Sequence, residues 1–416
     1  MKDSIVTNPN LAPQGHLKIA YAEMRMQPLL RIRDALAQTK PFAGMRIGMA
    51  LHVTKETAVL VQTLRAAGAE VAIASCNPLS TQDDVAAALA ESGVSVFAKK
   101  GETEKEYYEF IRAVIETEPH ITIDDGCDLV TEIHQNYPQL IPQIIGGCEE
   151  TTTGIIRLRA MEKDGALKYP IIAVNDNKTK HLFDNYYGTG QSTWDGILRA
   201  TNVLVAGKTV VISGYGDCGK GVALRAKGLG ARVIVTEVDP FKALQASMDG
   251  NYVMPLADAI PLGDIFITVT GNKHVLRKEH FEKMKNGVIL ANAGHFNVEI
   301  DVDALGTFPH KRVRDFLEEY LLKNGNRIYL VSDGRLCNLA AAEGHPSEVM
   351  ALSFAGQTLA CKYLVENKDT LQAHVLRLPD EIDAEIARLA LEADNIHIDT
   401  LTPEQAKYLA SWREGT

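Results

Sequence analysis

Cysteine is scarce in this chain of 416 residues, and the six that are present form no CxxC pair. That pattern gives neither a disulfide framework nor a zinc motif and suits a reducing compartment, so we expect no metal site. No apolar run approaches the length that spans a bilayer, and the first ten residues, MKDSIVTNPN, lack the basic and apolar regions of a signal peptide. These absences predict a cytoplasmic protein.

Excess positive charge is also missing, because the formal net charge is -10. An acidic chain does not favour nucleic acid or an anionic membrane as its main partner. Hydrophobic residues at 46% and charged residues at 23% are typical of a globular protein, and 416 residues are too many for one ordinary core. We find no internal repeat and no low-complexity linker, and we expect two or three compact domains.

The stretch from Thr209 to Asp239 reads TVVISGYGDCGKGVALRAKGLGARVIVTEVD and predicts a strand, a glycine turn, a helix and a second strand. In such a GxGxxG turn the first glycine permits the tight turn, the second lets the backbone approach a pyrophosphate, and the third lets helix and strand pack closely. Glu237 ends the second strand, where a carboxylate accepts ribose hydroxyls and repels a 2′-phosphate. The stretch predicts NAD binding; the alternative is a plain βαβ unit with a glycine-rich turn.

Strands alternate with helices on both sides of this stretch, which predicts an α/β fold with doubly wound parallel sheets. Before it we expect a helix over 16–37 and strands at 46–51, 70–75, 94–98, 120–123 and 169–174. After it we expect strands at 265–270, 288–291 and 327–331, then a long helix over 346–366 that crosses back to the first domain. We predict a substrate-binding domain at 1–185 and 347–378, a Rossmann NAD-binding domain at 186–346 and a small helical C-terminal tail at 379–416.

Polar side chains gather at or just after the ends of the first-domain strands: His52, Asn77, Asp125, Asp128, Glu149, Glu150 and Asn175. Ligands bind at that edge of open α/β sheets, and a histidine, carboxylates and a lysine are what proton transfer beside a sugar or hydroxy acid requires. Lys180 and Asp184 share a helical face at i and i+4, although spacing alone favours a solvated surface ion pair. From the sequence, His52 is equally well explained as a hydrogen-bonded core histidine.

Several longer motifs follow one another along the chain. They are Leu51-His52-x-Thr54, Ser80-Thr81-Gln82-Asp83, Asp124-Asp125-Gly126-x-Asp128, Glu149-Glu150-Thr151-Thr152-Thr153-Gly154, Asn175-Asp176-x-x-Thr179-Lys180-x-x-Phe183-Asp184-Asn185, Gly214-Tyr215-Gly216-Asp217, Asn292-x-Gly294-His295-Phe296, Gly334-Arg335-Leu336-x-Asn338-Leu339 and Gly344-His345-Pro346. Together they resemble the S-adenosylhomocysteine hydrolase family over nearly the whole chain. A series this long and ordered is highly specific.

The resemblance implies a reversible, NAD-dependent hydrolysis of the thioether of S-adenosyl-L-homocysteine to L-homocysteine and adenosine, in recycling of the methyl cycle. The ribose 3′-hydroxyl is oxidised to a ketone, which acidifies the C4′ proton. Homocysteine thiolate then leaves C5′, water adds, and the ketone is reduced again. A homotetramer is also implied, with no nucleic-acid or membrane partner.

The resemblance also implies roles for individual residues. Lys180 with Asp184 resembles the base for the 3′-hydroxyl proton, which requires a lowered lysine pKa in a buried site. Asp125 and His52 resemble the groups that serve C4′ and C5′, Glu150 the residue that binds the ribose hydroxyls, and Asn175 the residue that orients the lysine. Residues that resemble the rest of the substrate site are Thr54, Glu56, His295, Glu343 and His345. The implied cofactor contacts are Thr151, Thr152, Thr153, Asn185, Gly214, Tyr215, Gly216, Asp217, Cys218, Gly219, Glu237, Asn272, Ala293, Gly294, His295 and Asn338.

Four features depart from the family pattern. Glu56 occupies the position of the family's usual glutamine at the purine edge. Glu343 replaces the usual methionine, and Thr189 replaces a cysteine. The sequence stops at Thr416, short of the family's longer tail that reaches a neighbouring subunit's NAD. The short end, GGCEETTTGIIRL and Glu343 resemble an archaeal branch that acts on S-inosyl-L-homocysteine.

Adenine and hypoxanthine therefore both stay open as the base, because an ionised Glu56 accepts a hydrogen bond from the donor of either. Lys55 would satisfy the hypoxanthine oxygen only if it pointed inward, and we expect it at the surface.

Two other functions share parts of this pattern. An NAD-dependent 2-hydroxyacid dehydrogenase has the same two-domain layout but would show net NADH production with a hydroxy acid. A non-catalytic NAD-binding regulator would keep its function after Lys180→Ala or Asp125→Ala. The presence of Lys180, Asp184, Asp125 and His52 together argues against the regulator.

Overall fold

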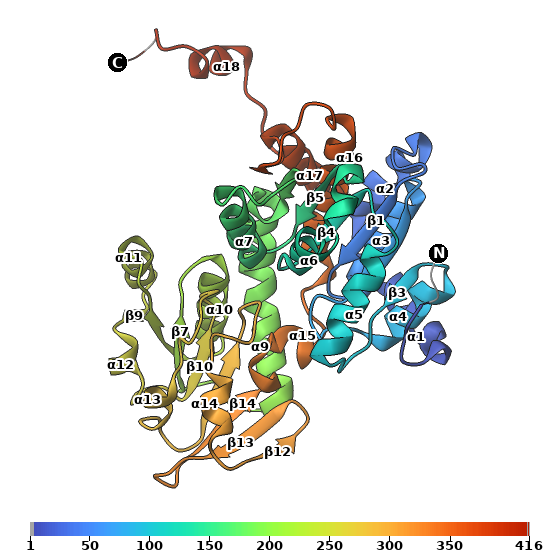
Figure 1. Ribbon diagram of the computed structural model, residues 1–416. Helices are drawn as coiled ribbons and strands as arrows, with labels where there is room; N and C mark the ends of the chain where they lie inside the picture. The colour runs from blue at the N-terminus through green and yellow to red at the C-terminus, as the bar shows by residue number, and fades with distance from the viewer. Residues whose placement is uncertain (1–3, 414, 416) are drawn as a thin grey trace.

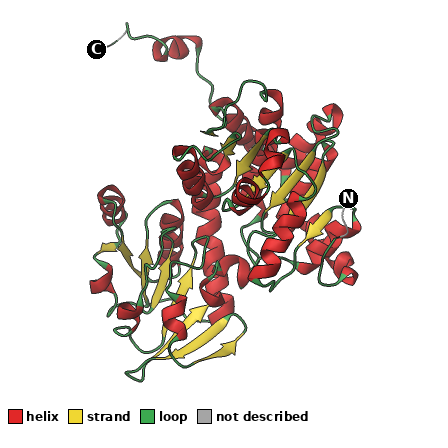
Figure 2. Ribbon diagram, viewed as in Figure 1, coloured by secondary structure: helices red, strands yellow, loops and turns green. Residues whose placement is uncertain are grey.

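The computed structural model describes residues 4–413 and 415. Residues 1–3, 414 and 416, which open the predicted substrate domain and close the predicted tail, lie outside the described part. Two β-sheets occupy separate lobes, and helix α9 (Thr189–Thr201) runs between them (Figure 1). Helices flank the strands of each lobe (Figure 2). Within the described residues, no helix is long and apolar enough to cross a membrane.

The sheet of the first lobe is parallel throughout, in the order β15-β6-β5-β4-β1-β2-β3. Its strands are β1 (Arg46–Ala50), β2 (Glu70–Ala74), β3 (Ser95–Phe97), β4 (Ile121–Asp124), β5 (Gly146–Glu149), β6 (Ile171–Ala173) and β15 (Val375–Leu376). One core contains residues of α1 (Ala12–Glu23), α2 (Gln27–Thr39), α3 (Lys55–Ala66), α4 (Asp83–Glu91), α16 (Ser347–Glu366) and α17 (Asp380–Ala393). The other contains residues of α5 (Glu104–Ile115), α6 (Asp128–Asn136) and α7 (Thr152–Lys163). The predicted doubly wound arrangement is confirmed here.

The single helix predicted over 16–37 is wrong, because the structure has two helices there. Met26 leaves the helical region with φ −107° and ψ 39°, and Pro28 lies in the first turn of α2. Proline has no N–H to continue a preceding helix and is well suited to the first turn of a new one. The helix predicted after Thr54 is confirmed, since the Thr54 hydroxyl accepts from the Thr57 amide and caps α3.

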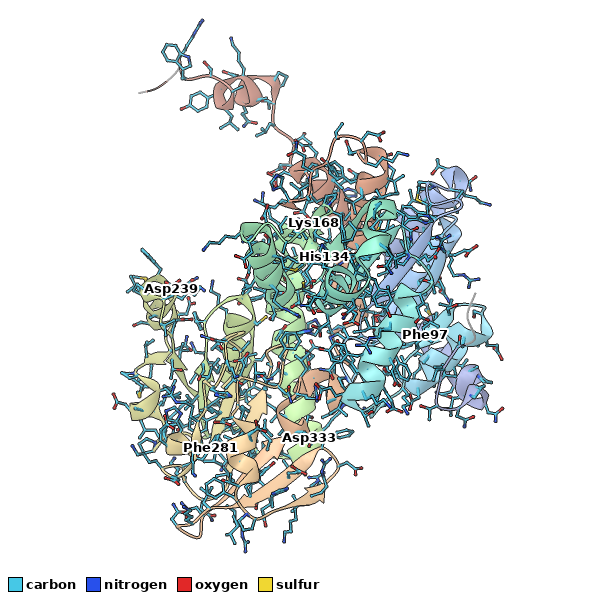
Figure 3. All side chains as sticks on the ribbon, viewed as in Figure 1. Phe97, His134, Lys168, Asp239, Phe281 and Asp333 are labelled. Atoms are coloured by element: carbon cyan, nitrogen blue, oxygen red, sulfur yellow. The ribbon has the colours of Figure 1, made fainter. Side chains whose placement is uncertain are left out.

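The sheet of the second lobe has the order β12-β13-β14-β11-β10-β7-β8-β9. Its strands are β7 (Thr209–Ser213), β8 (Arg232–Thr236), β9 (Tyr252–Val253), β10 (Ile265–Thr268), β11 (Val288–Asn292), β12 (His310–Arg314), β13 (Leu317–Leu321) and β14 (Arg327–Val331). Its helices are α9, α10 (Asp217–Gly228), α11 (Pro240–Met248), α12 (Leu256–Ala259), α13 (Lys278–Phe281), α14 (Val302–Gly306) and α15 (Cys337–Ala340). The sheet is parallel from β14 to β9, as predicted, but β12 and β13 add an antiparallel edge that the prediction lacked. Each lobe has its own cores: Phe97 is 2% exposed in the first and Phe281 is fully buried in the second (Figure 3).

The long helix α16 returns to the first lobe as predicted, where it packs against α2, α3, β5 and α17. The remaining elements are η1 (Pro9–Leu11), η2 (Pro138–Gln143), η3 (Val174–Asp176), α8 (Lys178–Lys180), η4 (His181–Gly188), η5 (Ser332–Gly334) and α18 (Pro403–Leu409). Helix α17 packs against α2, α8 and α16, whereas α18 extends away from the body (Figure 1). The region predicted as one tail therefore has a packed part and a projecting part.

The order of the strands reverses once in each sheet, between β1 and β4 in the first lobe and between β7 and β10 in the second. In the first sheet, Ala50 is level with Asp124, Asp124 with Glu149, and Glu149 with Ala173. The residues that follow these strand ends therefore share one edge. In open α/β sheets such reversal points open a crevice for ligands.

Candidate active site

A cavity of about 1630 Å³ is lined by residues that follow the strands of both sheets. It brings together nearly every residue singled out in the sequence: His52, Thr54, Glu56, Asp125, Glu150, Thr151, Thr152, Thr153, Asn175, Lys180, Asp184, Asn185, Gly214, Tyr215, Gly216, Asp217, Cys218, Glu237, Asn272, Ala293, Gly294, His295, Asn338 and His345. The residues singled out that are not part of this wall are Asn77, Asp128, Glu149, Gly219 and Glu343. Gly219 lies behind the glycine turn, where an added Cβ would meet the Gly214 carbonyl oxygen at 2.1 Å.

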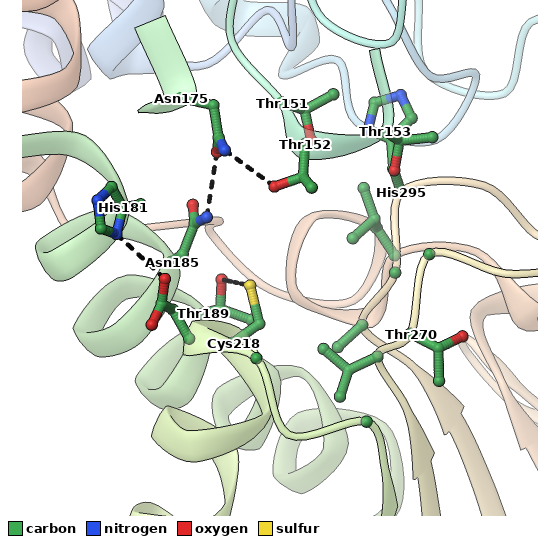
Figure 4. A pocket seen from close by; sticks show the side chains of 18 of the residues that line it. Thr151, Thr152, Thr153, Asn175, His181, Asn185, Thr189, Cys218, Thr270 and His295 are labelled. Carbon is green, nitrogen blue, oxygen red and sulfur yellow. Dashed lines mark hydrogen bonds and ion pairs between the residues drawn. The ribbon is translucent and has the colours of Figure 1, made fainter. Parts of the chain in front are cut away.

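Lys180 is held by four oxygen atoms deep in this cavity. Its Nζ lies 2.7 Å from Asp184 Oδ2, 2.8 Å from Asn185 Oδ1, 3.2 Å from Asn175 Oδ1 and 3.7 Å from Glu150 Oε1. Asn185 and Asn175 point toward one another and are hydrogen-bonded (Figure 4). The lysine and Asp184 are 4% and 3% exposed, so the alternative of a solvated surface pair is wrong.

Local backbone structure explains how lysine and aspartate meet. Lys180 ends the short helix α8, and Asp184 lies in the π-helical segment His181–Gly188, one turn further on. The i,i+4 spacing predicted from the sequence is retained across this change of helix type. Wider helical turns of this kind are frequent at functional sites.

The electrostatics of Lys180 differ from the expectation of a lowered pKa. Burial lowers the pKa of the Lys180 ammonium, but the carboxylates of Asp184 and Glu150 outweigh burial and raise it above the usual lysine value. Lys180 is therefore a cation in this structure. It acts as a base only when a further positive charge beside it, or the loss of a carboxylate, lowers that pKa.

Glu150 receives two donors from α16 that the sequence analysis did not find. Gln357 Nε2 donates to Glu150 Oε2 at 2.5 Å, and the Ser353 hydroxyl donates to Glu150 Oε1. Burial raises the pKa of Glu150 to about 7, although nearby Lys180 acts in the opposite direction. Its carboxyl group is fixed in place and titrates near neutrality.

A second group of polar side chains surrounds Asp125. His52 Nε2 lies 3.4 Å from Asp125 Oδ2, and His295 Nδ1 lies 3.5 Å from Asp125 Oδ1. Burial lowers the pKa of His52 to about 4, partly opposed by Asp125, so the ring is neutral at pH 7. His52 follows β1, Asp125 follows β4 and His295 comes from the second lobe, so the two lobes together assemble this group of titratable side chains.

The glycine turn has the features that a dinucleotide requires. Gly214 has φ of +105°, which other residues rarely adopt, and an added Cβ at Gly216 would meet no atom within 4 Å, so the turn leaves open space. Among the described residues, Asn338 Oδ1 is buried without a hydrogen-bond partner, and Asn338 lines the cavity. Glu237 lines it as well, with its carboxylate held by the Tyr215 and Val238 amides. These residues fit NAD, with the phosphates at the turn.

A chain of charges that the sequence analysis placed differently continues from Glu56 at the cavity wall to Lys55 and Glu343, which line a separate pocket. Lys55 is 12% exposed at its side chain, not a surface lysine, and its Nζ lies 3.2 Å from Glu56 Oε1 and 3.3 Å from Glu343 Oε2. Ser347 donates to Glu56 at 2.7 Å. Glu343 is half exposed and also pairs with Arg199 at 3.6 Å. Glu343 thus reaches the substrate wall only through Lys55.

His345 is connected to Lys180 through Asp184. Its Nδ1 is hydrogen-bonded to Asp184, and its Nε2 lies 3.4 Å from the Thr189 hydroxyl. The Cys218 thiol donates to that hydroxyl at 3.5 Å (Figure 4). Thr189 was singled out only as a departure from the family pattern, and it lines the cavity.

The sequence analysis did not single out some residues that contact the site, because no local sequence motif marks them. Ser353 and Gln357 lie about two hundred positions after Glu150 on a mostly apolar helix, and Cys76 follows β2 beside His52. A search for polar residues on the buried face of the 346–366 helix would have singled out the first two.

Fold and site define an α/β protein of two lobes, with a nucleotide-binding turn in one lobe and a cluster of buried titratable side chains centred on the other. Residues 185–344 match the family model described as S-adenosyl-L-homocysteine hydrolase, NAD binding domain, and residues 3–139 match the model S-adenosyl-L-homocysteine hydrolase. The adenosylhomocysteinase of Aquifex aeolicus is 57% identical over 99% of both chains. The S-inosyl-L-homocysteine hydrolase of Methanocaldococcus jannaschii is also 57% identical over 99% of both chains. The chain belongs to the S-adenosyl-L-homocysteine hydrolase family and has that family's NAD-binding domain.

Among solved structures, a dipicolinate synthase chain from Bacillus halodurans is similar with a TM-score of 0.49 and 13% identity, over 79% of this chain and 99% of that one. A likeness at this level carries no functional argument.

Proposed function

We propose that this protein hydrolyses, reversibly and with NAD, the thioether of S-adenosyl-L-homocysteine or S-inosyl-L-homocysteine to L-homocysteine and the nucleoside. The observation that carries this proposal is the buried group of Lys180, Asp184 and Glu150 in the cavity beside the dinucleotide turn. The names of the two relatives support the same chemistry. Its role is recycling of the methyl cycle.

NAD, when bound, supplies reversible oxidation at the carbon that bears the ribose 3′-hydroxyl. Glu150 accepts hydrogen bonds from the ribose hydroxyls while Gln357 and Ser353 hold its carboxyl group. Lys180, once neutral, takes the 3′-hydroxyl proton, and Asp184 and Asn175 keep its nitrogen oriented.

Asp125 and His52 serve the other side of the ribose in this proposal. Asp125 takes the C4′ proton, and neutral His52 exchanges protons with the departing thiolate and the incoming water at C5′. Their 3.4 Å separation allows a proton to pass between them, and His295 keeps Asp125 oriented from the other lobe.

The purine binds at the end of the cavity formed by Thr54, Glu56 and His345. Glu56 offers an acceptor that suits either the N1–H of hypoxanthine or the amino group of adenine, while Lys55, which does not line this cavity, pairs with the Glu56 carboxylate. The substrate is one of these two nucleoside thioethers.

We also propose the assignment of 1–185 and 347–378 as the substrate-binding domain, 186–346 as the NAD-binding domain and 379–416 as the tail. The first sheet and its returning helix α16 support the substrate-binding domain, and the glycine turn supports the second. We also propose that the protein is cytoplasmic and forms a homotetramer, as the family resemblance implies.

The test is an assay of the purified protein with both thioethers, in which released homocysteine and free NADH are followed together. We expect homocysteine from at least one substrate, no net NADH, and loss of activity in Lys180→Met. Lys105→Met, at a lysine that is 86% exposed, serves as the control and stays active. Release from neither thioether overturns the proposal, and NADH accumulation with a hydroxy acid identifies a dehydrogenase.

A further inference from the structure

Glu149 is the last residue of β5, and its carboxyl group lies behind the cavity wall instead of facing the cavity. The side chain is fully buried. The Gly126 N–H donates to Glu149 Oε1 at 2.9 Å, and the Thr151 N–H donates to the same oxygen at 3.0 Å. One oxygen atom therefore connects the loop that follows β4 to the loop that follows β5.

Gly126 belongs to the backbone that places Asp125. Its φ of +110° is a value that other residues rarely adopt, and an added Cβ would lie 2.5 Å from His295 Nε2, so the turn packs closely against the second lobe. Arg157 donates to the Gly126 carbonyl oxygen. The N–H and the C=O of Gly126 are thus both held by side chains, directly after Asp125.

Thr151 immediately precedes α7 and leads to the lysine group of the site. The hydroxyl of the next residue, Thr152, accepts a hydrogen bond from Asn175 (Figure 4), and Asn175 Oδ1 accepts one from Lys180. Thr151 and Thr152 also line the cavity and belong to the expected cofactor contacts. The second amide that Glu149 holds therefore lies where the cofactor site and the lysine group meet.

The surroundings of Glu149 suit an uncharged carboxyl group. Burial, with the carboxyl groups of Asp124 and Asp125 adding to it, raises the pKa of Glu149 well above its usual range. Among the described residues, none forms a hydrogen bond with Glu149 Oε2, whereas a buried charge would require partners. Gly154 leaves room for this group, because an added Cβ at Gly154 would lie 2.1 Å from Glu149 Cδ.

We propose that Glu149 is a positioning residue that serves the substrate side and the cofactor side of the cavity at once. Its Oε1 fixes the Gly126 peptide and with it the direction of Asp125. The same oxygen fixes Thr151 and with it the start of α7. The effect on Asp125 rests on the proposed function, whereas the effect on the cofactor rests only on the NAD-binding domain.

Glu149→Ala, made in the NAD-containing protein, removes the acceptor of both amides. We expect kcat for homocysteine release to fall by about 10–10²-fold, since a displacement of about 1 Å can cost about 10²-fold. NAD should leave the loaded protein about tenfold faster, which corresponds to the loss of one hydrogen bond. KM for the thioether should stay nearly constant, because Glu150 keeps its donors Ser353 and Gln357.

Two further variants separate positioning from a general loss of stability. Glu149→Gln offers an uncharged oxygen to the same two amides, so kcat and the rate of NAD release should stay close to those of the unchanged protein. Gly154→Ala leaves Glu149 in the chain but places a methyl group against its carboxyl carbon. It should lower kcat as Glu149→Ala does, although alanine favours a helix more than glycine.

Glu102→Ala is the matched control. Glu102 is 4% exposed, accepts from the Lys99 amide and has an oxygen without a hydrogen-bond partner among the described residues, but it does not line the cavity. Its kcat and its rate of NAD release should not change. Circular dichroism confirms that each variant is folded, and Gly154→Ala supplies the same measurements if Glu149→Ala does not fold.

Three results would overturn the role of Glu149. They are a folded Glu149→Ala that keeps either the kcat or the NAD release rate of the unchanged protein, a Glu149→Gln that loses as much as Glu149→Ala, and a Glu102→Ala that loses kcat equally. If the unchanged protein releases homocysteine from neither thioether, the proposed function fails, and the rates of NAD release alone then decide the role of Glu149.

Discussion

The ammonium nitrogen of Lys180 lies 2.7 Å from a carboxylate oxygen of Asp184, and the other oxygen of that carboxylate is bonded to His345. Lys180 follows strand β6 of the first lobe, whereas His345 precedes the helix that returns from the second lobe. One buried aspartate therefore connects the two lobes at the candidate catalytic lysine. Burial raises the pKa of Asp184, but the contacts with His345 and Lys180 outweigh burial and hold that pKa below its usual range.

Asp184→Asn removes a carboxylate that raises the pKa of Lys180 and keeps the side-chain shape. We expect the plateau value of kcat at high pH to fall by about 10²-fold, because the Lys180 nitrogen is no longer held in position. In a plot of kcat against pH, the rise of kcat with pH should also move to lower pH, because Lys180 then loses its proton more easily. Glu109→Gln, at the exposed i,i+4 pair of Lys105, is the control. A profile that does not move would contradict the role of Asp184.

Local sequence signals predicted the parts of the fold that depend on short-range chemistry. β-branched runs indicated most strands, the GxGxxG turn indicated the dinucleotide crevice, and the cap at Thr54 marked the start of α3. Strand β5 was missed because Gly146-Gly147-Cys148-Glu149 has no β-branched residue, and only its burial between β4 and β6 makes it a strand. The β12–β13 hairpin was missed because β12 is largely charged and exposed, and because β13 has two glutamates between its buried residues, Leu317 and Tyr320.

The candidate site was less predictable where partners are distant in the chain. The motifs located Glu150, but no local pattern pairs it with Gln357, 207 positions later. The orientation of the Lys55 side chain depends on its hydrogen bond to Glu343, 288 positions away. The pKa of Lys180 is a balance between burial and two carboxylates, and the sequence analysis left the two carboxylates out of that balance. Sequence motifs identify the residues of the site, whereas the packing of the folded chain determines their contacts and their charges.

Glu150 should give the substrate affinity a pH dependence near neutrality. Burial raises the pKa of Glu150 to about 7, so the carboxylate that best accepts two ribose hydroxyls is present above that pH. We expect KM to fall as pH rises through about 7 and Glu150→Gln to abolish this change. The variant should raise KM by about tenfold or more, as the loss of hydrogen bonds to a charged group predicts.

Gln357→Leu provides a sharper version of the same measurement. It removes a donor that favours the charged form of Glu150, so the transition in KM should move to higher pH. A KM that is independent of pH in the unchanged protein would show that Glu150 does not titrate in this range.

Lys55 should contribute to stability through its nearly buried partner. Lys55→Met leaves the Glu56 carboxylate, which is 2% exposed, without its cation, and we expect the free energy of unfolding to fall by about 2–4 kcal/mol. Lys55→Met with Glu56→Gln should lose less than the sum of the single changes, because the neutral amide needs no cation. Urea denaturation of all four proteins measures the coupling. Additive losses would mean that the two side chains act independently.

Asp383 should hold the candidate catalytic lysine, Lys180, from a helix that the sequence analysis assigned to the tail. Its carboxylate accepts from the Lys178 amide at 2.6 Å, from the Thr179 amide at 3.2 Å and from the Thr179 hydroxyl, and Lys180 is the next residue. Asp383→Ala leaves these donors unpaired, so we expect a loss of about 1–2 kcal/mol in stability.

Because the change loosens the turn that places the Lys180 nitrogen, kcat should fall while KM for the nucleoside stays nearly constant. Asp383→Asn keeps one acceptor oxygen and should recover part of kcat. Asp380→Ala is the matched control on the same helix, since Asp380 is 69% exposed, and its stability should change by less than about 0.5 kcal/mol. If Asp383→Ala lowers stability but leaves kcat unchanged, α17 supports the fold without positioning the lysine. A fall in kcat that Asp383→Asn partly reverses would place α17 within the machinery of the site.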